Sequence, residues 1–180
     1  MMMVHDFSRK LEWSNGANIE SDKERIKYAL GDRCVRVEKT DDEVDKTGVD
    51  YYAHLARGAV VNIDAKRREA GASKFWRHGE PELAIETRSV VKPFKIGWTF
   101  STSSSVDYIL YSFEPCDSNN YYFLPFQLLR KVSYESAKRW RIKYGEMTQT
   151  SNGWKSTCIF VPASVVLLAI QKSMIYKAGA

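Results

Sequence analysis

Two aspartates and a lysine stand close together between residues 48 and 66, in the segment GVDYYAHLARGAVVNIDAK. Asp64 and Lys66 are two residues apart in a run that alternates apolar and polar residues, so in a β-strand they project from the same face, roughly 7 Å apart. Asp50 begins a similar run. Neighbouring carboxylates repel each other, and a divalent cation such as Mg²⁺, which prefers one or two carboxylate ligands, relieves that repulsion. A nearby ammonium can orient a water molecule or stabilise charge that develops on a phosphate.

The two runs predict a β-hairpin that brings these residues together. Apolar residues occupy one face of each run, and polar residues occupy the other. Directly opposed residues of a hairpin share a face, so keeping the apolar faces together requires Asp50 to lie opposite Asp64 or Lys66. Either register leaves a loop of about three residues that contains Gly58. The sequence therefore predicts that two carboxylates and one ammonium converge on one patch of sheet.

An aspartate on one strand followed by Asp-x-Lys on the next resembles the PD-(D/E)XK nuclease superfamily, which includes restriction endonucleases, Holliday-junction resolvases and phage exonucleases. The resemblance implies an α/β fold with a central mixed β-sheet flanked by helices, in the order α-β-β-β-α-β. It also implies a hydrolase that cleaves phosphodiester bonds, with Asp50 and Asp64 as metal ligands and Lys66 as the catalytic lysine. The implied cofactor is Mg²⁺, for which Mn²⁺ can substitute. Val49 stands where many members carry a proline.

The competing interpretation of these residues is a solvated hairpin face with an ordinary Asp–Lys pair, because a D-x-K triplet alone is common at average composition.

The segment 95–113 adds to the resemblance. Its Gly-Trp followed by an Asp-Tyr that enters a strand resembles phage-encoded members of the superfamily.

Further acidic residues are candidates for the same site. Glu86 lies on a strand predicted over residues 82–91, and we expect it to be an additional catalytic acid and metal ligand. In the resembling superfamily the first helix often contributes an acid, which makes Glu20 and Glu24 candidates. Capping of the helix by Glu24, as partner of Ser21, is the more ordinary role for that residue. His54 shares a strand face with Asp50 but is expected to lie towards the hairpin loop.

Basic residues are concentrated after the hairpin and are expected to contact a nucleic-acid backbone, with DNA as the expected partner. The first 50 residues carry more acidic than basic side chains, whereas the remainder is strongly basic. Such a distribution attracts phosphates, although a solvated basic surface is an alternative explanation. The predicted contacts are made by Arg67, Arg68, Lys74, Lys138, Arg139, Arg141 and Lys143.

Composition indicates one folded domain over residues 1–180, with 1–18 as a partly ordered extension. Of the 180 residues, 44% are hydrophobic and 13% aromatic, which argues against disorder. The three cysteines are widely spaced and lack metal-ligand spacing, so they predict reduced thiols and a cytoplasmic location. No signal peptide is recognisable, and the longest apolar run is too short to span a membrane. The oligomeric state is left open, a homodimer included.

Periodicity and turn residues predict the remaining elements. A helix is expected over 19–30, ended by Gly31, and a strand follows from Cys34. Later in the chain we expect strands over 82–91, 107–113 and 154–161, helices over 122–132, 134–144 and 162–174, and a polar loop over 148–153. The strand over 107–113 is a candidate for the centre of the sheet.

Three functions of different classes compete on this sequence. The first is a Mg²⁺-dependent endonuclease acting on DNA. The second is a nucleic-acid-binding module that keeps the fold without catalysis, and the third is a protein-interaction or inhibitor domain. The intact set of Asp50, Asp64 and Lys66 favours the first over the second, and the basic second half of the chain disfavours the third.

Overall fold

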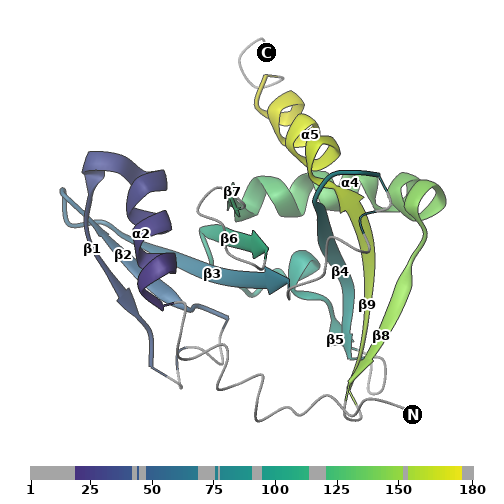
Figure 1. Ribbon diagram of the computed structural model, residues 1–180, viewed down its shortest axis with the longest axis horizontal. Helices are drawn as coiled ribbons and strands as arrows, with labels where there is room; N and C mark the ends of the chain where they lie inside the picture. The colour runs from purple at the N-terminus through teal and green to yellow at the C-terminus, as the bar shows by residue number, and fades with distance from the viewer. Residues whose placement is uncertain are drawn as a thin grey trace. The chain divides into compact units, whose positions relative to one another are not determined.

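The computed structural model describes residues 19–41, 44, 48–68, 76, 78–90, 95–113, 121–151 and 154–175. Among these are three α-helices, a mixed five-stranded sheet and a second sheet of four strands, which confirms the predicted α/β class (Figure 1). The chain divides into two compact units. Of the described residues, those up to 68 and those of 104–126 belong to one unit, and those of 76–103 and 127–175 belong to the other. That the two form a single domain stays a prediction.

The first unit consists of one helix and the five-stranded sheet. Its elements are α2 (Ile19–Leu30), the 3₁₀ turn η1 (Gly31–Arg33), β1 (Cys34–Lys39), β2 (Tyr51–Leu55), β3 (Val60–Arg68), β6 (Tyr108–Phe113) and β7 (Tyr121–Pro125). The strand order is β1-β2-β3-β6-β7. β3 pairs with β6 in parallel, and the other neighbours are antiparallel. The central strand is therefore β3, and the prediction that 107–113 lies at the centre is wrong.

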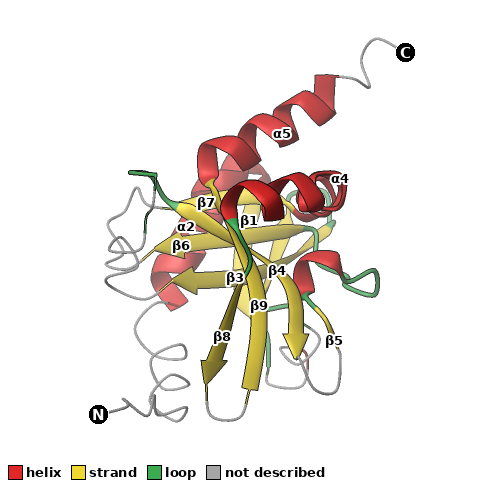
Figure 2. Ribbon diagram, turned by 90° about the vertical axis from the view of Figure 1, so that its right-hand side faces the viewer, coloured by secondary structure: helices red, strands yellow, loops and turns green. Residues whose placement is uncertain are grey.

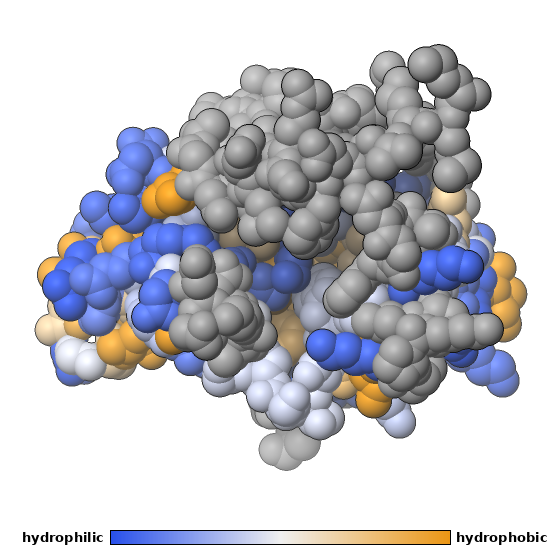
Figure 3. Space-filling view, turned by 90° about the horizontal axis from the view of Figure 1, so that it is seen from below, coloured by the Kyte–Doolittle hydropathy of each residue, from blue (hydrophilic) through white to orange (hydrophobic). Residues whose placement is uncertain are grey.

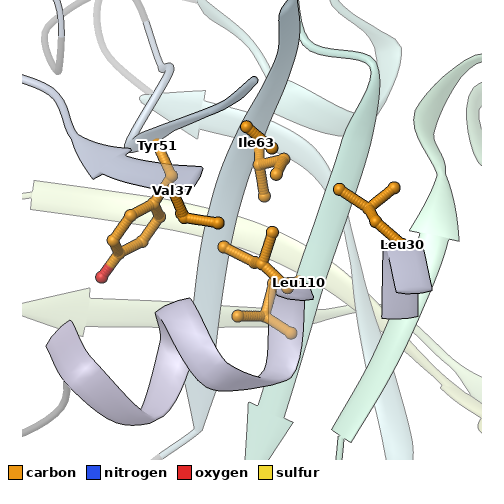
Figure 4. Close-up of a cluster of buried hydrophobic side chains, with 7 residues drawn as sticks. Leu30, Val37, Tyr51, Ile63 and Leu110 are labelled. Carbon is orange, nitrogen blue, oxygen red and sulfur yellow. The ribbon is translucent and has the colours of Figure 1, made fainter. Parts of the chain in front are cut away.

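The core of this unit lies between α2 and one face of the sheet (Figure 4). Seven fully or almost fully buried residues form it, namely Ile26, Leu30, Val37, Tyr51, Ala53, Ile63 and Leu110. The helix ends at Leu30 because Gly31 adopts the left-handed conformation, with φ of 61°. It begins at Ile19, as predicted, but its predicted cap is not observed. Ser21 lies inside the helix, so the predicted capping box with Glu24 is wrong.

The predicted hairpin is confirmed in both register and loop. Tyr51 pairs with Ile63 and Ala53 with Val61, which keeps the apolar faces together. The Leu55 N–H donates to the Ala59 carbonyl at 2.8 Å, so three residues form the loop. The last of them, Gly58, has φ of 80°, as a three-residue hairpin loop requires.

The second unit contains the four-stranded sheet and two helices. Its elements are β4 (Glu82–Val90), β5 (Lys95–Ile96), the 3₁₀ turn η3 (Trp98–Phe100), α4 (Phe126–Tyr144), β8 (Met147–Ser151), β9 (Trp154–Pro162) and α5 (Ala163–Ile175). The antiparallel strand order is β5-β4-β9-β8 (Figure 2). Glu80 caps α5, because its carboxylate accepts the N–H and the hydroxyl of Ser164 at 3.1 and 2.7 Å.

Several predicted elements differ from the observed ones. The helix expected over 122–132 begins only at Phe126, because residues 121–125 pair with β6 as a strand. The polar loop expected over 148–153 is largely β8, which pairs with β9. Strand pairing overrides local composition in both places. Along the chain, the described residues between β3 and β6 form β4, β5 and η3, whereas the resemblance implied an α-helix after β3.

The surface of the described residues carries scattered apolar side chains. Tyr134 and Ile142 on α4 are each 78% exposed. Figure 3 shows one face of the molecule, on which hydrophobic residues stand among hydrophilic ones. None of the described helices combines the length and the apolar composition that crossing a membrane requires.

Candidate active site

Asp64 and Lys66 project from the face of β3 that is turned away from α2. Ile63 and Ala65, the residues between and before them, pack against the α2 core, so alternation places the two charged side chains on the other face. The Lys66 Nζ lies 2.7 Å from the Asp64 Oδ1. The Asp64 side chain is only 7% exposed, while that of Lys66 is 32% exposed. The carboxylate is therefore nearly buried, and its ammonium partner keeps access to solvent.

Asp50 joins this pair through the backbone of β3. Its Oδ2 accepts the N–H of Ala65, the residue between Asp64 and Lys66, at 2.6 Å. The Asp50 N–H donates to the Ile63 carbonyl at 2.8 Å, so Asp50 and Tyr51 both oppose Ile63, as in a β-bulge. Bulges re-aim a side chain next to a site. A bulge thus brings the Asp50 carboxylate to the backbone between Asp64 and Lys66, in line with the predicted hairpin. That the two carboxylates and the ammonium form one site stays a prediction.

Lys39 is a second lysine at this site, and the sequence reasoning missed it. Its Nζ lies 3.5 Å from the Asp50 Oδ1 and 5.4 Å from the centre of the Tyr51 ring. β1 pairs with β2 so that Lys39 lies opposite Tyr51. Predicting that contact needed the register of β1 against β2. The charged sequence between these two strands gives no signal for that register. Each aspartate of the site thus has a lysine partner.

The candidate ligands for a hard divalent cation at this site are carboxylate oxygens. Asp50 and Asp64 supply two carboxylates, which is the number that Mg²⁺ takes from protein when water and phosphate oxygens complete its shell. Within the described ranges, no three His, Cys, Asp or Glu side chains lie close enough to hold a metal between them. The fit therefore rests on two carboxylates and not on a closed protein cage.

The other predicted acids belong to other elements of the fold. Glu86 belongs to β4 in the second unit, where its Oε2 accepts the Ser89 hydroxyl at 2.9 Å and the Trp98 N–H at 3.2 Å. Its predicted role as a catalytic acid and metal ligand stays a prediction. Glu20 is 82% exposed and pairs with Lys23, and Glu24 is exposed. The acid of α2 that contacts the hairpin is Asp22, which the sequence reasoning did not single out.

The basic residues near the hairpin have different surroundings. Arg67 is only 10% exposed and forms an ion pair with the buried Asp22, on the face covered by α2. We therefore leave Arg67 out of the proposed phosphate contacts. Arg68 ends β3 and is partly exposed, while Lys74 lies outside the described residues.

The basic residues of α4 lie on its exposed side. Lys138, Arg139, Arg141 and Lys143 are all exposed. The Arg139 guanidinium donates to the Ser136 hydroxyl at 3.1 Å, and that of Arg141 lies 3.3 Å from Glu146. Trp140 and Tyr144 are buried, with 1% and 5% exposure, so they belong to the core and are not available to stack on bases.

No protein-family model matches this chain, and no curated protein or solved structure matches it either. Membership in the PD-(D/E)XK superfamily therefore stays a prediction that rests on the hairpin residues.

Proposed function

We propose that this protein is a Mg²⁺-dependent endonuclease that hydrolyses phosphodiester bonds of DNA. The observation that carries the proposal is the 2.7 Å pair of Asp64 and Lys66, with the Asp50 carboxylate accepting the backbone N–H of Ala65, the residue between them. Placing two carboxylates beside each other is unfavourable without a compensating cation. The element order α2-β1-β2-β3 supports the proposal, because it is the first half of the order that the resemblance implies.

Each residue of the site has a separate task in this proposal. Asp50 and Asp64 would hold Mg²⁺, which when bound stabilises negative charge on a phosphate and lowers the pKa of water. The Lys66 ammonium, held 2.7 Å from Asp64, orients the attacking water or stabilises the charge that develops on the phosphate oxygens. Its partial exposure lets substrate reach it. The Lys39 ammonium lies 3.5 Å from the Asp50 Oδ1, so it would compete with a bound cation for that carboxylate.

A calorimetric titration with Mg²⁺ and Mn²⁺, combined with a plasmid-nicking assay, tests this function. We expect one divalent ion to bind and plasmid DNA to be nicked only when that ion is present. Linear duplex, single strands and a four-way junction belong in the same assay, because the site does not define the form of DNA that is cut. Absence of cutting for every substrate with either metal would contradict the proposal.

A second candidate function is a nucleic-acid-binding module without catalysis. The specific observation in its favour is that both aspartates already have a lysine partner, so their charges are balanced without a metal. This candidate predicts nucleic-acid binding that Mg²⁺ does not change, with no cleavage. The titration and nicking assay above therefore separate the two candidates directly.

Replacing Lys39 with methionine should tighten the binding of a divalent cation by roughly fivefold to thirtyfold. The Lys39 ammonium lies 3.5 Å from Asp50, and at such a distance it repels a divalent ion by about 1–2 kcal/mol in a water-like medium. Titration of Mn²⁺ into wild type and Lys39→Met measures the change, with the exposed Lys27→Met on α2 as control. Weaker binding in Lys39→Met would show that Lys39 instead holds Asp50 in place.

Replacing the four basic residues of α4 with alanine should weaken nucleic-acid binding uniformly across sequences. Each lost phosphate contact lowers the slope of log affinity against log salt by roughly one unit. The change comprises Lys138, Arg139, Arg141 and Lys143 together. A variant with the same loss of charge in the first unit, at Lys23, Lys27, Arg33 and Arg36, is the matched control. Equal slopes in the two variants would assign the α4 residues to an ordinary solvated surface.

A further inference from the structure

A buried polar cluster joins α2 to the two strands that carry the candidate site. Asp22 is fully buried, and its Oδ2 accepts the Tyr51 hydroxyl at 2.9 Å and pairs with the Arg67 guanidinium. Its Oδ1 lies 3.7 Å from Arg25, which is itself buried. A single carboxylate of the helix thus contacts β2 and β3 at once.

The two strand residues in this cluster are the direct neighbours of the site residues. Tyr51 follows Asp50, and Arg67 follows Lys66. Successive side chains of β3 point to opposite faces, so anchoring Arg67 on the α2 face fixes the direction of Lys66 on the other face. Anchoring Tyr51 fixes the backbone of the bulge from which Asp50 extends. From this adjacency we propose that Asp22 is a positioning residue, which orients Asp50 and Lys66 through Tyr51 and Arg67. The inference rests on the proposed function.

The place of the contact explains why such an anchor is needed. The regular β2–β3 pairing stops at Tyr51 and Ile63, and Asp50 lies in the bulge just beyond it. Past that point β2 and β3 no longer pair with each other, although β3 continues along β6 to Arg68. The Tyr51 hydroxyl bond to Asp22 fixes the strand at the bulge, and the Arg67 ion pair fixes β3 beyond Lys66.

Burying the charged groups of this cluster costs free energy that apolar residues in their place would not cost. Burial raises the pKa of the Asp22 carboxyl, while the Arg67 and Arg25 charges and the Tyr51 bond oppose that rise. A buried ion pair usually contributes little net stability compared with apolar residues of the same volume. Its directional contacts, by contrast, determine one orientation of the strands they join. This is the property that a site built on two strands requires.

Tyr51→Phe and Asp22→Asn test the proposal, with Glu20→Gln as control. Glu20→Gln also removes a carboxylate from α2, but its ion pair with Lys23 lies on the surface. The direct reporter is the Ala65 amide proton, which the Asp50 carboxylate binds. We expect its NMR shift to move and its hydrogen exchange to accelerate by about tenfold or more in Tyr51→Phe, and not in Glu20→Gln.

In cleavage assays, Tyr51→Phe and Asp22→Asn should each lower kcat by roughly 10–100-fold with KM little changed. This is the size of effect found for residues that orient a metal ligand. An unaltered Ala65 amide in Tyr51→Phe would overturn the proposal. If Asp22→Asn does not fold, the Tyr51→Phe variant decides alone, because it keeps both the ring and the buried charges. The amide reporter needs neither metal nor substrate, so it gives its result even if the wild type cuts nothing.

Discussion

Lys66→Ala should abolish cleavage while changing nucleic-acid affinity by less than about 1 kcal/mol, the size of one exposed ionic contact. The Lys66 ammonium is expected to act on charge that develops only along the reaction coordinate, so its loss appears in kcat and not in binding. The strand should survive, because the side chain is 32% exposed and lies on the face away from the core. Cleavage rate and binding constant, measured side by side in Mg²⁺, check this result.

Two further variants sharpen the comparison. Lys66→Arg should not restore cutting, because the wider guanidinium cannot place a donor where the ammonium stood. Arg68→Ala removes a charge from the same face of β3, two residues further on, and should weaken binding slightly without stopping cleavage. If cutting continued at the wild-type rate in Lys66→Ala, the catalytic site would lie elsewhere in the chain.

Asp64→Asn should abolish both divalent-cation binding and cleavage. The loss of affinity should be at least the roughly 10–100-fold seen when a residue that only orients a metal ligand is removed. Asp64 is the more buried of the two candidate ligands. Water from solvent therefore cannot easily take the place of the carboxylate that Asp64→Asn removes. Titration with Mg²⁺ or Mn²⁺ measures the binding, and the nicking assay measures the activity.

The control for this variant is Glu38→Gln on β1. Glu38 is also an acid of the five-stranded sheet, but its carboxylate pairs with His54 at 2.8 Å and with Arg36 at 3.2 Å. We expect Glu38→Gln to keep full metal affinity. Undiminished affinity in Asp64→Asn would remove the proposed metal site, whatever the nicking assay shows.

The hairpin and its charged residues were determined by the sequence itself. Alternation along 49–55 and 60–66 defines which side chains share a face, and Gly58 readily adopts the left-handed conformation common in three-residue hairpin loops. Contacts between residues close in the chain follow from such local rules. The Asp64–Lys66 pair and the approach of Asp50 were predictable for that reason. The helix 19–30 and the strand β4 followed from periodicity in the same way.

The tertiary structure decided everything that depends on distant partners. Tyr121–Pro125 and Met147–Ser151 are strands only because β6 and β9 pair with them. Lys39 reaches Asp50 through the register of β1, and Trp140 is a core residue because it lies on the buried side of its own helix, α4. Arg67 lies in the basic segment that was expected to contact phosphates, yet it pairs with Asp22, 45 residues earlier in the chain. A charged side chain takes the partner that burial brings to it, and burial is a property of the folded chain as a whole.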